Sequence, residues 1–493
     1  MSNTLKEKQE SVLMFIVRIL IGPVVFLIIR AIPIVDLETN GQIALAIYGW
    51  IIAWWILTPV PWAVTALLPL ILFPLFGIMN LRYTAELYGQ RILFFLVGIM
   101  LVGYAFQKHG LAKRIALNVL CIKGIATSGS RIILVIIAVT AVSSAFIDNA
   151  ANIALWIPIA MSVARSVVEI NGKSGGTGSA PRFLAASALA VLYGSVIGGL
   201  ATPAGVPFNP LTISILEQLT SYSVTFGQWT ATGVIFMIVL IPLVWIILRI
   251  MSPSEIKTLG GGSIEFFQEE KKKLGKVSLA EKYVLIVFFI MIAMWFFPPF
   301  LNIAAIRFID MWYVPAAGAL LLYLLPVDIK TREMTLGQKD FQAGVNWNVL
   351  FLVIGGSATA GALVNLGVTD WLTSVIGGGM TTTALPWITG VITTLVGHNT
   401  SGTATTNILS TILFPIAEGL GYNATILARI IAAMAFGAAL PWSGAGPAAA
   451  FATGEIKIAD MIRIGVVVTV VTLVVVVILS MLLVPAFGAY TII

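Results

Sequence analysis

Cysteine, histidine and charge are scarce in this chain of 493 residues, which has one cysteine, two histidines and 10% charged residues. The single Cys121 excludes a disulfide framework and a cysteine-ligated metal site. Two histidines are too few for a histidine cluster, so we expect no metal, no cofactor and no enzyme activity. Since 59% of the residues are hydrophobic, the chain cannot cover a soluble globule with polar surface. The composition predicts an all-α polytopic membrane protein.

Apolar runs long enough to cross about 30 Å of hydrocarbon predict about eleven transmembrane helices. These runs lie near 11–35, 42–58, 62–79, 90–107, 183–220, 228–248, 280–299, 311–326, 347–366, 425–454 and 462–487. Most of the 28 Lys and Arg residues fall in alternate loops. The positive-inside rule therefore places the amino terminus in the cytoplasm and the carboxyl terminus outside the cell membrane. The basic residues indicate orientation in the lipid bilayer and not binding to nucleic acid.

Two polar stretches interrupt this apolar sequence. The first, Ile-Asp-Asn-Ala-Ala-Asn at 147–152, lies inside the run 132–164, and the second, at 398–407, lies inside the run 383–416. Lys and Arg flank the first run on both sides, whereas none is close to the second. We therefore expect two re-entrant hairpins that enter from opposite faces of the membrane. Such a pair predicts an inverted-topology repeat.

Each hairpin is followed by a second interruption rich in glycine and proline, at 198–209 in the run 183–220 and at 440–447 in the run 425–454. Irregular backbone within a membrane is tolerated where it lines a cavity or is covered by protein. Paired interruptions in two halves of a chain indicate the substrate site of a transporter. The predicted organisation is a membrane helix at 1–40, a first repeat at 41–250, a cytoplasmic linker at 251–279 and a second repeat at 280–493.

At these motifs the sequence resembles the divalent anion/sodium symporter family of dicarboxylate and citrate carriers, whose hairpin tips each carry a Ser-Asn-Thr triplet. The spacing to Pro158 matches the first triplet to Asp148-Asn149-Ala150, and the spacing to the Ala-Glu-Gly-Leu-Gly at 417–421 matches the second to Ser401-Gly402-Thr403. The Gly-Val-Pro-Phe-Asn at 205–209 is similar to the family's Gly-Ser-Pro-Pro-Asn. The resemblance implies eleven spans, two opposing hairpins, an elevator-type transporter and a homodimer.

The resemblance also implies a site for small dicarboxylates at the amino termini of the hairpin half-helices, which offer N–H donors and positive potential to an anion. It assigns the following residues to substrate binding: Asn149, Ala150, Thr202, Pro207, Ser401, Gly402, Thr403 and Ser443. Three further positions correspond to former sodium sites or to charge compensation, namely Ser144, Asp148 and His398.

The triplets of this chain depart from those of the sodium-coupled relatives. Asp148 stands in place of a serine and Gly402 in place of an asparagine, and the loop 442–445 also differs. We therefore expect sodium-independent exchange of C4 and C5 dicarboxylates. The alternative is a sodium- or proton-coupled symporter of a dicarboxylate, citrate or an inorganic oxyanion, in which Asp148 and His398 carry the coupling ion. Arg429, near the outer end of its run, is expected to extend to the membrane interface.

Overall fold

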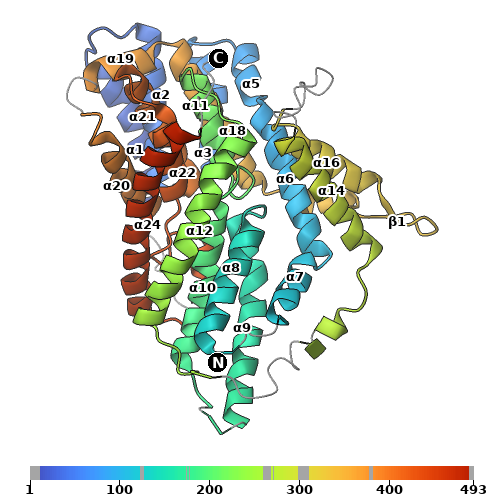
Figure 1. Cartoon of the computed structure of the whole chain (residues 1–493). Helices are drawn as coiled ribbons and strands as arrows, with labels where there is room; N and C mark the ends of the chain where they lie inside the picture. Colours follow the sequence, from blue (N-terminus) through green and yellow to red (C-terminus); the bar gives the residue numbers. More distant parts are fainter. Residues whose placement is uncertain are drawn as a thin grey trace.

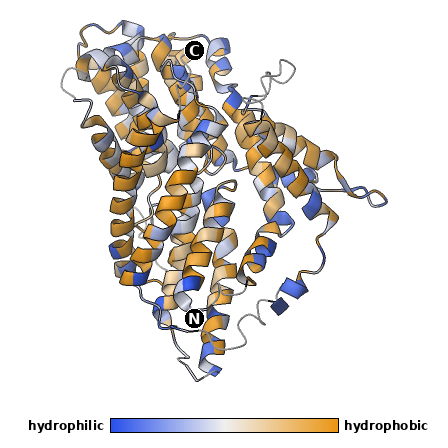
Figure 2. Cartoon of the chain, viewed as in Figure 1, coloured by the Kyte–Doolittle hydropathy of each residue, from blue (hydrophilic) through white to orange (hydrophobic). Residues whose placement is uncertain are grey.

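The described residues of the computed structural model are 12–122, 127–173, 175–176, 178–258, 268–269, 271–297, 310–376 and 381–487. Nearly all of their regular structure is helical, and one short antiparallel pair joins β1 (Pro326–Asp328) to β2 (Glu333–Met334). The helices stand side by side in an elongated body whose flanks are largely hydrophobic (Figures 1 and 2). The protein is thus an all-α polytopic membrane protein, as the composition predicts.

Within the described residues, 9 helical segments are long and apolar enough to cross a membrane, judged by length and composition. They are α1 (Val12–Ala31), α2 (Thr39–Leu57), α5 with α6 (Leu81–Lys108), α9 (Asn149–Lys173), α10 (Pro181–Gly199), α12 (Phe226–Met251), α14 (Leu279–Phe296), α18 (Trp347–Asn365) and α24 (Ile458–Ala486).

This set differs from the eleven predicted spans because some apolar runs are divided by proline and glycine. The run 62–79 forms α3 (Trp62–Thr65) and α4 (Leu68–Leu75), with Pro69 at the start of α4. The run 311–326 forms only α16 (Val314–Leu324), whose second residue is Pro315. The amino-terminal residues 1–11 and the linker residues 259–267 lie outside the described part of the chain.

All four polar or glycine-rich interruptions separate two helices. The first hairpin consists of α8 (Gly129–Ser144) and α9, and the second of α20 (Leu385–Gly397) and α21 (Gly402–Gly419). Between them in sequence, α10 is followed by α11 (Phe208–Leu219), and after the second hairpin α22 (Ala424–Met434) is followed by α23 (Ala445–Phe451). Each interruption therefore presents the amino terminus of one helix and the carboxyl terminus of another.

The hairpins and the broken helices pack into one group, which we call the hairpin bundle (α8–α12 and α20–α24). In it α10 lies against α8, α9 and α12, while α24 lies against α12 and α22. A second group, the flanking bundle, includes α1–α6, α14, α16 and α18, and Figure 1 shows α6, α14 and α16 together at one side. The two bundles meet where α11 and α21 contact α18.

Two short helices lie beyond the ends of these spans, α7 (Leu111–Leu120) and α17 (Gln338–Gly344), and α19 (Val368–Ile376) packs on α21. The end of α6 is joined to α17 by an ion pair, in which Lys108 Nζ lies 2.7 Å from Asp340 Oδ2. Burial raises the pKa of Asp340, but hydrogen bonds from Lys108 and from the Gly337 N–H outweigh it, so the pKa stays below its usual value. The carboxylate is therefore ionised at neutral pH and holds α17 to α6.

Candidate functional site

The first tip lies between the end of α8 at Ser144 and the start of α9 at Asn149. Asp148 caps α9, because its Oδ1 accepts hydrogen bonds from the N–H groups of Ala150 at 3.1 Å and Ala151 at 3.4 Å. A carboxylate at this position also interacts favourably with the positive end of the helix dipole. The side chain of Asp148 thereby closes the amino end of the half-helix.

Buried amide side chains fix the conformation of this tip. Asn149 is 2% exposed, and its Oδ1 accepts a hydrogen bond of 2.7 Å from Ser144 Oγ. Asn152 is fully buried and donates from Nδ2 to Ser195 Oγ at 2.8 Å, which ties α9 to α10. The sequence analysis did not assign Asn152 to the site, although it belongs to the same polar stretch.

The first break, at 200–207, is attached directly to the first tip. Thr202 Oγ1 donates a short hydrogen bond to the carbonyl of Ala145, and a Cβ on Gly199 would collide with the side chain of Asn149. Asn209 closes the loop from the other end, because its Nδ2 donates to Gly199 O at 2.8 Å and to Thr202 O at 2.7 Å. The tip and the break therefore form one rigid unit.

The second tip is attached to the second break through His398. The Nδ1 of His398 lies 2.8 Å from Thr394 O, and its Nε2 lies 3.4 Å from the N–H nitrogen of Ala439. A neutral imidazole with its proton on Nδ1 satisfies both contacts. Ser443 in the same break donates from Oγ to Gly437 O at 2.8 Å. His398, which was predicted to compensate charge, thus joins the second hairpin to the second break.

The two tip and break units meet at the centre of the hairpin bundle. A Cβ on Gly402 would lie 3.0 Å from the ring of Phe208 and 3.1 Å from the carbonyl oxygen of Ala435. Val206, Phe208 and Ala435 form a small apolar cluster between the two breaks. All four interruptions are therefore neighbours, as the sequence analysis predicts from their recurrence in the two halves.

A cavity of about 410 Å³ lies between the first tip, the first break and the flanking helices α6 and α18. Its lining consists of Phe95, Leu96, Ile99, Met100, Gly103, Tyr104, Gln107, Phe146, Ile147, Asp148, Ala150, Ala151, Pro203, Ala204, Val206, Pro207, Ala343, Gly344, Val345, Asn346 and Val349. Asp148, Ala150 and Pro207 were expected at the site. The other predicted positions, Asn149, Thr202, Ser144, Ser401, Gly402, Thr403, Ser443 and His398, do not line this cavity.

On α6 the lining runs from Phe95 to Gln107, toward the end of the helix that leads into the basic loop after Lys108. Sequence reasoning missed these residues because their apolar pattern is the same as that of any packed helix. Two polar residues of the cavity lining, Gln107 and Asn346, lie at the ends of apolar runs. A polar residue at such a place is ordinarily expected to be exposed to solvent.

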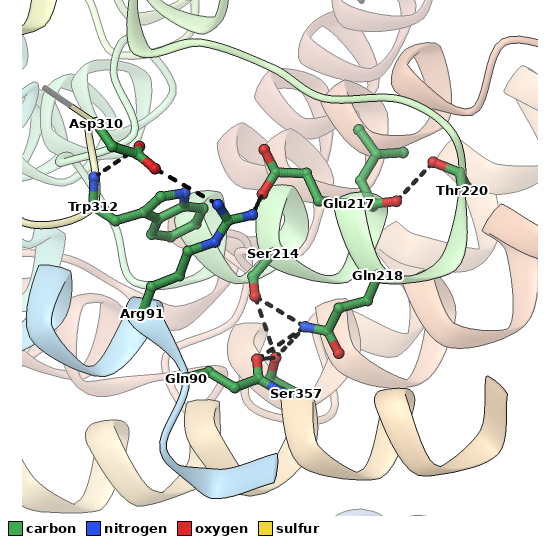
Figure 3. A network of polar contacts seen from close by, with 10 residues as sticks. Gln90, Arg91, Ser214, Glu217, Gln218, Thr220, Asp310, Trp312 and Ser357 are labelled. Carbon is green, nitrogen blue, oxygen red and sulfur yellow. Dashed lines mark hydrogen bonds and ion pairs between the residues drawn. The ribbon is translucent and has the colours of Figure 1, made fainter. Parts of the chain in front are cut away.

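A polar network bridges the two bundles at the opposite end of the same interface, where several of its residues line a second cavity of about 460 Å³ (Figure 3). Arg91 at the start of α6 pairs with Glu217 of α11 at 2.5 Å and with Asp310 at 3.6 Å, and its guanidinium lies 5.0 Å from the Trp312 ring. Gln218 of α11 donates to Ser357 Oγ of α18 at 2.7 Å. Polar groups of the hairpin bundle are thus bound to both α6 and α18 at this end.

Arg429 does not extend to the membrane interface, so that expectation is wrong. The residue is 2% exposed, and its guanidinium lies 4.1 Å from the centre of the Trp229 ring. The cause is that α22 is enclosed by α11, α20, α21 and α24, which leaves the side chain no path along the lipid.

In the part of the chain that the structure describes, no group of three His, Cys, Asp or Glu side chains could hold a metal ion. The tips and breaks carry hydroxyl, amide and backbone N–H groups at helix termini. Such donors suit anions.

Comparisons with known proteins agree with this architecture. Residues 14–488 match the family model described as the sodium:sulfate symporter transmembrane region. The "Sodium-dependent dicarboxylate transporter SdcS" of Staphylococcus saprophyticus is 30% identical over 487 residues, which covers 95% of this chain and 91% of the relative. The protein of the same name from Staphylococcus aureus (strain USA300) is 27% identical over 471 residues, 91% of this chain and 87% of the relative.

Among solved structures, the Alcanivorax borkumensis YdaH transporter has a similar fold, with a TM-score of 0.55 and 14% sequence identity. The similarity covers 97% of this chain and 99% of that chain. At this level of identity the likeness concerns the fold alone.

Proposed function

The chain belongs to the family of the sodium:sulfate symporter transmembrane region, one of the divalent anion/sodium symporters, and from that premise we propose that it carries C4 and C5 dicarboxylates. As a member of this family it is a multi-pass secondary transporter and not an enzyme. The relatives named above are dicarboxylate transporters, which supports this choice of substrate over an inorganic oxyanion.

The cavity at the first tip is the observation that carries the proposal. A dicarboxylate has about two negative charges at neutral pH, and its desolvation must be offset by donors and positive potential. The amino terminus of α9 faces this cavity, and the amino terminus of α21 lies nearby beside Phe208. Each terminus carries roughly half a positive charge. At α9 the N–H groups of Ala150 and Ala151 are already bound to Asp148, so this terminus attracts an anion through its dipole.

The position of the cavity suggests an inward-facing state. It extends along α6 toward the basic loops, which the positive-inside rule places in the cytoplasm, and the ion pair between Arg91 and Glu217 bridges the two bundles at the outer end. Transport then requires the hairpin bundle to move along α6 and α18 with the substrate bound. We propose this elevator-type movement, with the amino terminus in the cytoplasm, the carboxyl terminus outside and a homodimeric assembly as the family resemblance implies.

The ion pair between Glu217 and Arg91 should stabilise the inward-facing state, because its partners lie on different bundles. Glu217→Gln should destabilise that state by about 1 kcal/mol, which lowers the ratio of inward-facing to outward-facing protein roughly five-fold. The measurement is thiol labelling of Gln107→Cys, which lines the inner cavity, in a background with Cys121 replaced by serine. Labelling from the cytoplasmic side should become slower.

The matched control is Glu86→Gln. Glu86 pairs with Arg82 at 3.2 Å within α5, so its loss leaves the contact between the bundles intact. The same labelling rate in Glu217→Gln and in the parent protein would contradict the role of this ion pair.

For the coupling we propose exchange of one dicarboxylate for another without sodium. The second tip supports this mode, because Gly402 has no side-chain oxygen and the imidazole of His398 fills the junction with the loop at Ala439. In the sodium-coupled relatives an asparagine of the triplet is a sodium ligand, according to the resemblance described above. A carrier without this ion should return across the membrane only when loaded.

Sodium-coupled symport is the second candidate, and the names of the relatives, which are sodium-dependent dicarboxylate transporters, favour it over exchange. The first tip also supports it. Asp148 lines the same cavity as the proposed dianion, and a cation beside this carboxylate would relieve their repulsion. Ser144 and Asn149 of the same tip carry neutral oxygens, which are hydrogen-bonded to each other.

Uptake of labelled succinate into proteoliposomes separates the two modes. Exchange predicts uptake only when the vesicles contain dicarboxylate, at the same rate in sodium, potassium or choline buffer. Sodium-driven uptake into vesicles without dicarboxylate would contradict exchange and establish the symport. Absence of dicarboxylate uptake under every condition would contradict the proposed substrate.

A further inference from the structure

Arg429 places a permanent positive charge inside the hairpin bundle. The residue lies on α22 and is 2% exposed, and its guanidinium lies between two rings of α12, 4.1 Å from the centre of Trp229 and 4.9 Å from that of Phe236. An arginine stays protonated in such a setting. Because charged groups within a membrane are costly, a buried one usually has a function.

The guanidinium points at the carboxyl end of α10. That helix ends at Gly199, and Arg429 Nη2 lies 3.4 Å from the carbonyl oxygen of Leu200, the residue that caps it. Helix carboxyl ends carry carbonyl groups without helical partners and a partial negative charge, which a cation stabilises. A side chain of the second half of the chain therefore caps a half-helix of the first.

The neighbouring carbonyl groups at this helix end have their own partners. Gly198 O accepts from the Ala201 N–H at 2.9 Å, and Gly199 O accepts from Asn209 Nδ2 at 2.8 Å. The contact with Arg429 thus completes a set of hydrogen bonds that holds the loop at 200–207 in one conformation.

This loop forms part of the candidate site. Thr202 donates to Ala145 of the first tip, and Pro203 and Ala204 line the cavity. A shift of the α10 carboxyl end would therefore move both the first tip and the cavity wall. The charge of Arg429 also acts in a poorly polar interior, where Coulomb interactions are weakly screened.

We propose that Arg429 is a positioning residue for the substrate, which holds the end of α10 against the first tip and supplies fixed positive charge for binding a dianion. This inference rests on the proposed function, in which the dianion binds at the first tip. It assigns charge compensation to a residue outside both triplets, whereas His398 is satisfied as a neutral side chain.

The test compares substrates that differ in charge. Succinate and its monomethyl ester compete with labelled succinate for the purified protein in proteoliposomes, at a pH where the first is a dianion and the second a monoanion. In Arg429→Met and Arg429→Gln, inhibition by succinate should weaken by roughly ten-fold or more. Inhibition by the ester should weaken several-fold less, since it has half the charge. Arg429→Lys should retain most of the affinity for succinate.

The matched control is Arg249→Met, since Arg249 also lies over an aromatic ring of α12, 5.5 Å from the centre of Trp245, but is exposed at the end of the helix. It should leave both inhibition constants unchanged. If the methionine variant does not fold, the glutamine and lysine variants still give the comparison, monitored by size-exclusion chromatography.

Equal weakening of succinate and ester, or equal loss in the lysine and methionine variants, would overturn the role of Arg429 while leaving dicarboxylate transport intact. Absence of succinate binding by the unchanged protein would instead contradict the proposed function, and the inference would fall with it.

Discussion

Ala150→Trp should reduce dicarboxylate transport to less than roughly one tenth of its normal rate. Ala150 lies on the first turn of α9 and lines the cavity of about 410 Å³ beside α6. A tryptophan there would occupy much of the space between the first tip and the flanking bundle, and a close-packed wall cannot yield without strain. The measurement is the initial rate of succinate uptake into proteoliposomes, with the amount of folded protein determined in parallel.

Ala154→Trp is the matched control, because it makes the same substitution on the same helix four residues later. Ala154 is exposed and does not line the cavity. It should keep nearly normal uptake. Similar rates in the two variants, whether both normal or both abolished, would contradict the assignment of the substrate site to this cavity.

Gly198→Ala should destabilise the folded protein strongly although it adds a single methyl group. Gly198 lies on α10 where this helix crosses α8, and an added Cβ would collide with the backbone carbonyl of Ala141. A backbone atom cannot move aside as a flexible side chain can. We expect a loss of about 1–3 kcal/mol in the free energy of unfolding, with partial loss of the first hairpin's packing.

The measurement is the apparent melting temperature in detergent. Gly227→Ala serves as the control, since Gly227 is near the start of α12 and an added Cβ would meet its nearest neighbour, Phe296, only at 3.8 Å. Alanine there should leave the protein unchanged or raise its stability by up to about 1 kcal/mol through helix propensity. An unchanged melting temperature for Gly198→Ala would show that α8 and α10 are not packed as closely as the structure has them.

The breaks in the helices could be predicted because polar, glycine and proline residues are conspicuous within apolar sequence. The stretch 147–152 follows the end of α8 at Ser144 and contains the start of α9, and the glycines and prolines at 198–209 separate α10 from α11. Buried polar side chains need hydrogen-bond partners, and the enclosed tip supplies them, as Ser144 does for Asn149. The recurrence of such interruptions in both halves then indicated that they meet.

The cavity wall on α6 could not be predicted in this way. Leu96 and Met100 look like any buried residues of a membrane helix, and only the tertiary arrangement shows that they face the first tip. Periodicity locates an apolar face but does not tell whether that face contacts another helix or a cavity. The division of 62–79 into α3 and α4 was also missed, because the run is apolar throughout despite its prolines.

Arg429 shows a different limit of sequence reasoning. Its position near the end of an apolar run suggested an exposed end, on the assumption that the run forms one straight helix across the membrane. Instead α22 ends at Met434, and Trp229 of α12 covers the guanidinium. A more informative signal is the place of Arg429 just before the break at 440–447 of the second half. The first half has a corresponding break, and the helix that ends there, α10, has carbonyl groups that a cation can cap.

The binding site for the substrate is the central claim, and a structure of the protein determined with succinate bound tests it most directly. The account predicts ligand density in the cavity between the first tip and α6, beside Ala150 and Pro207. Density at the outer end of the interface, beside Arg91 and Gln218, or at any place that neither hairpin touches, would contradict it.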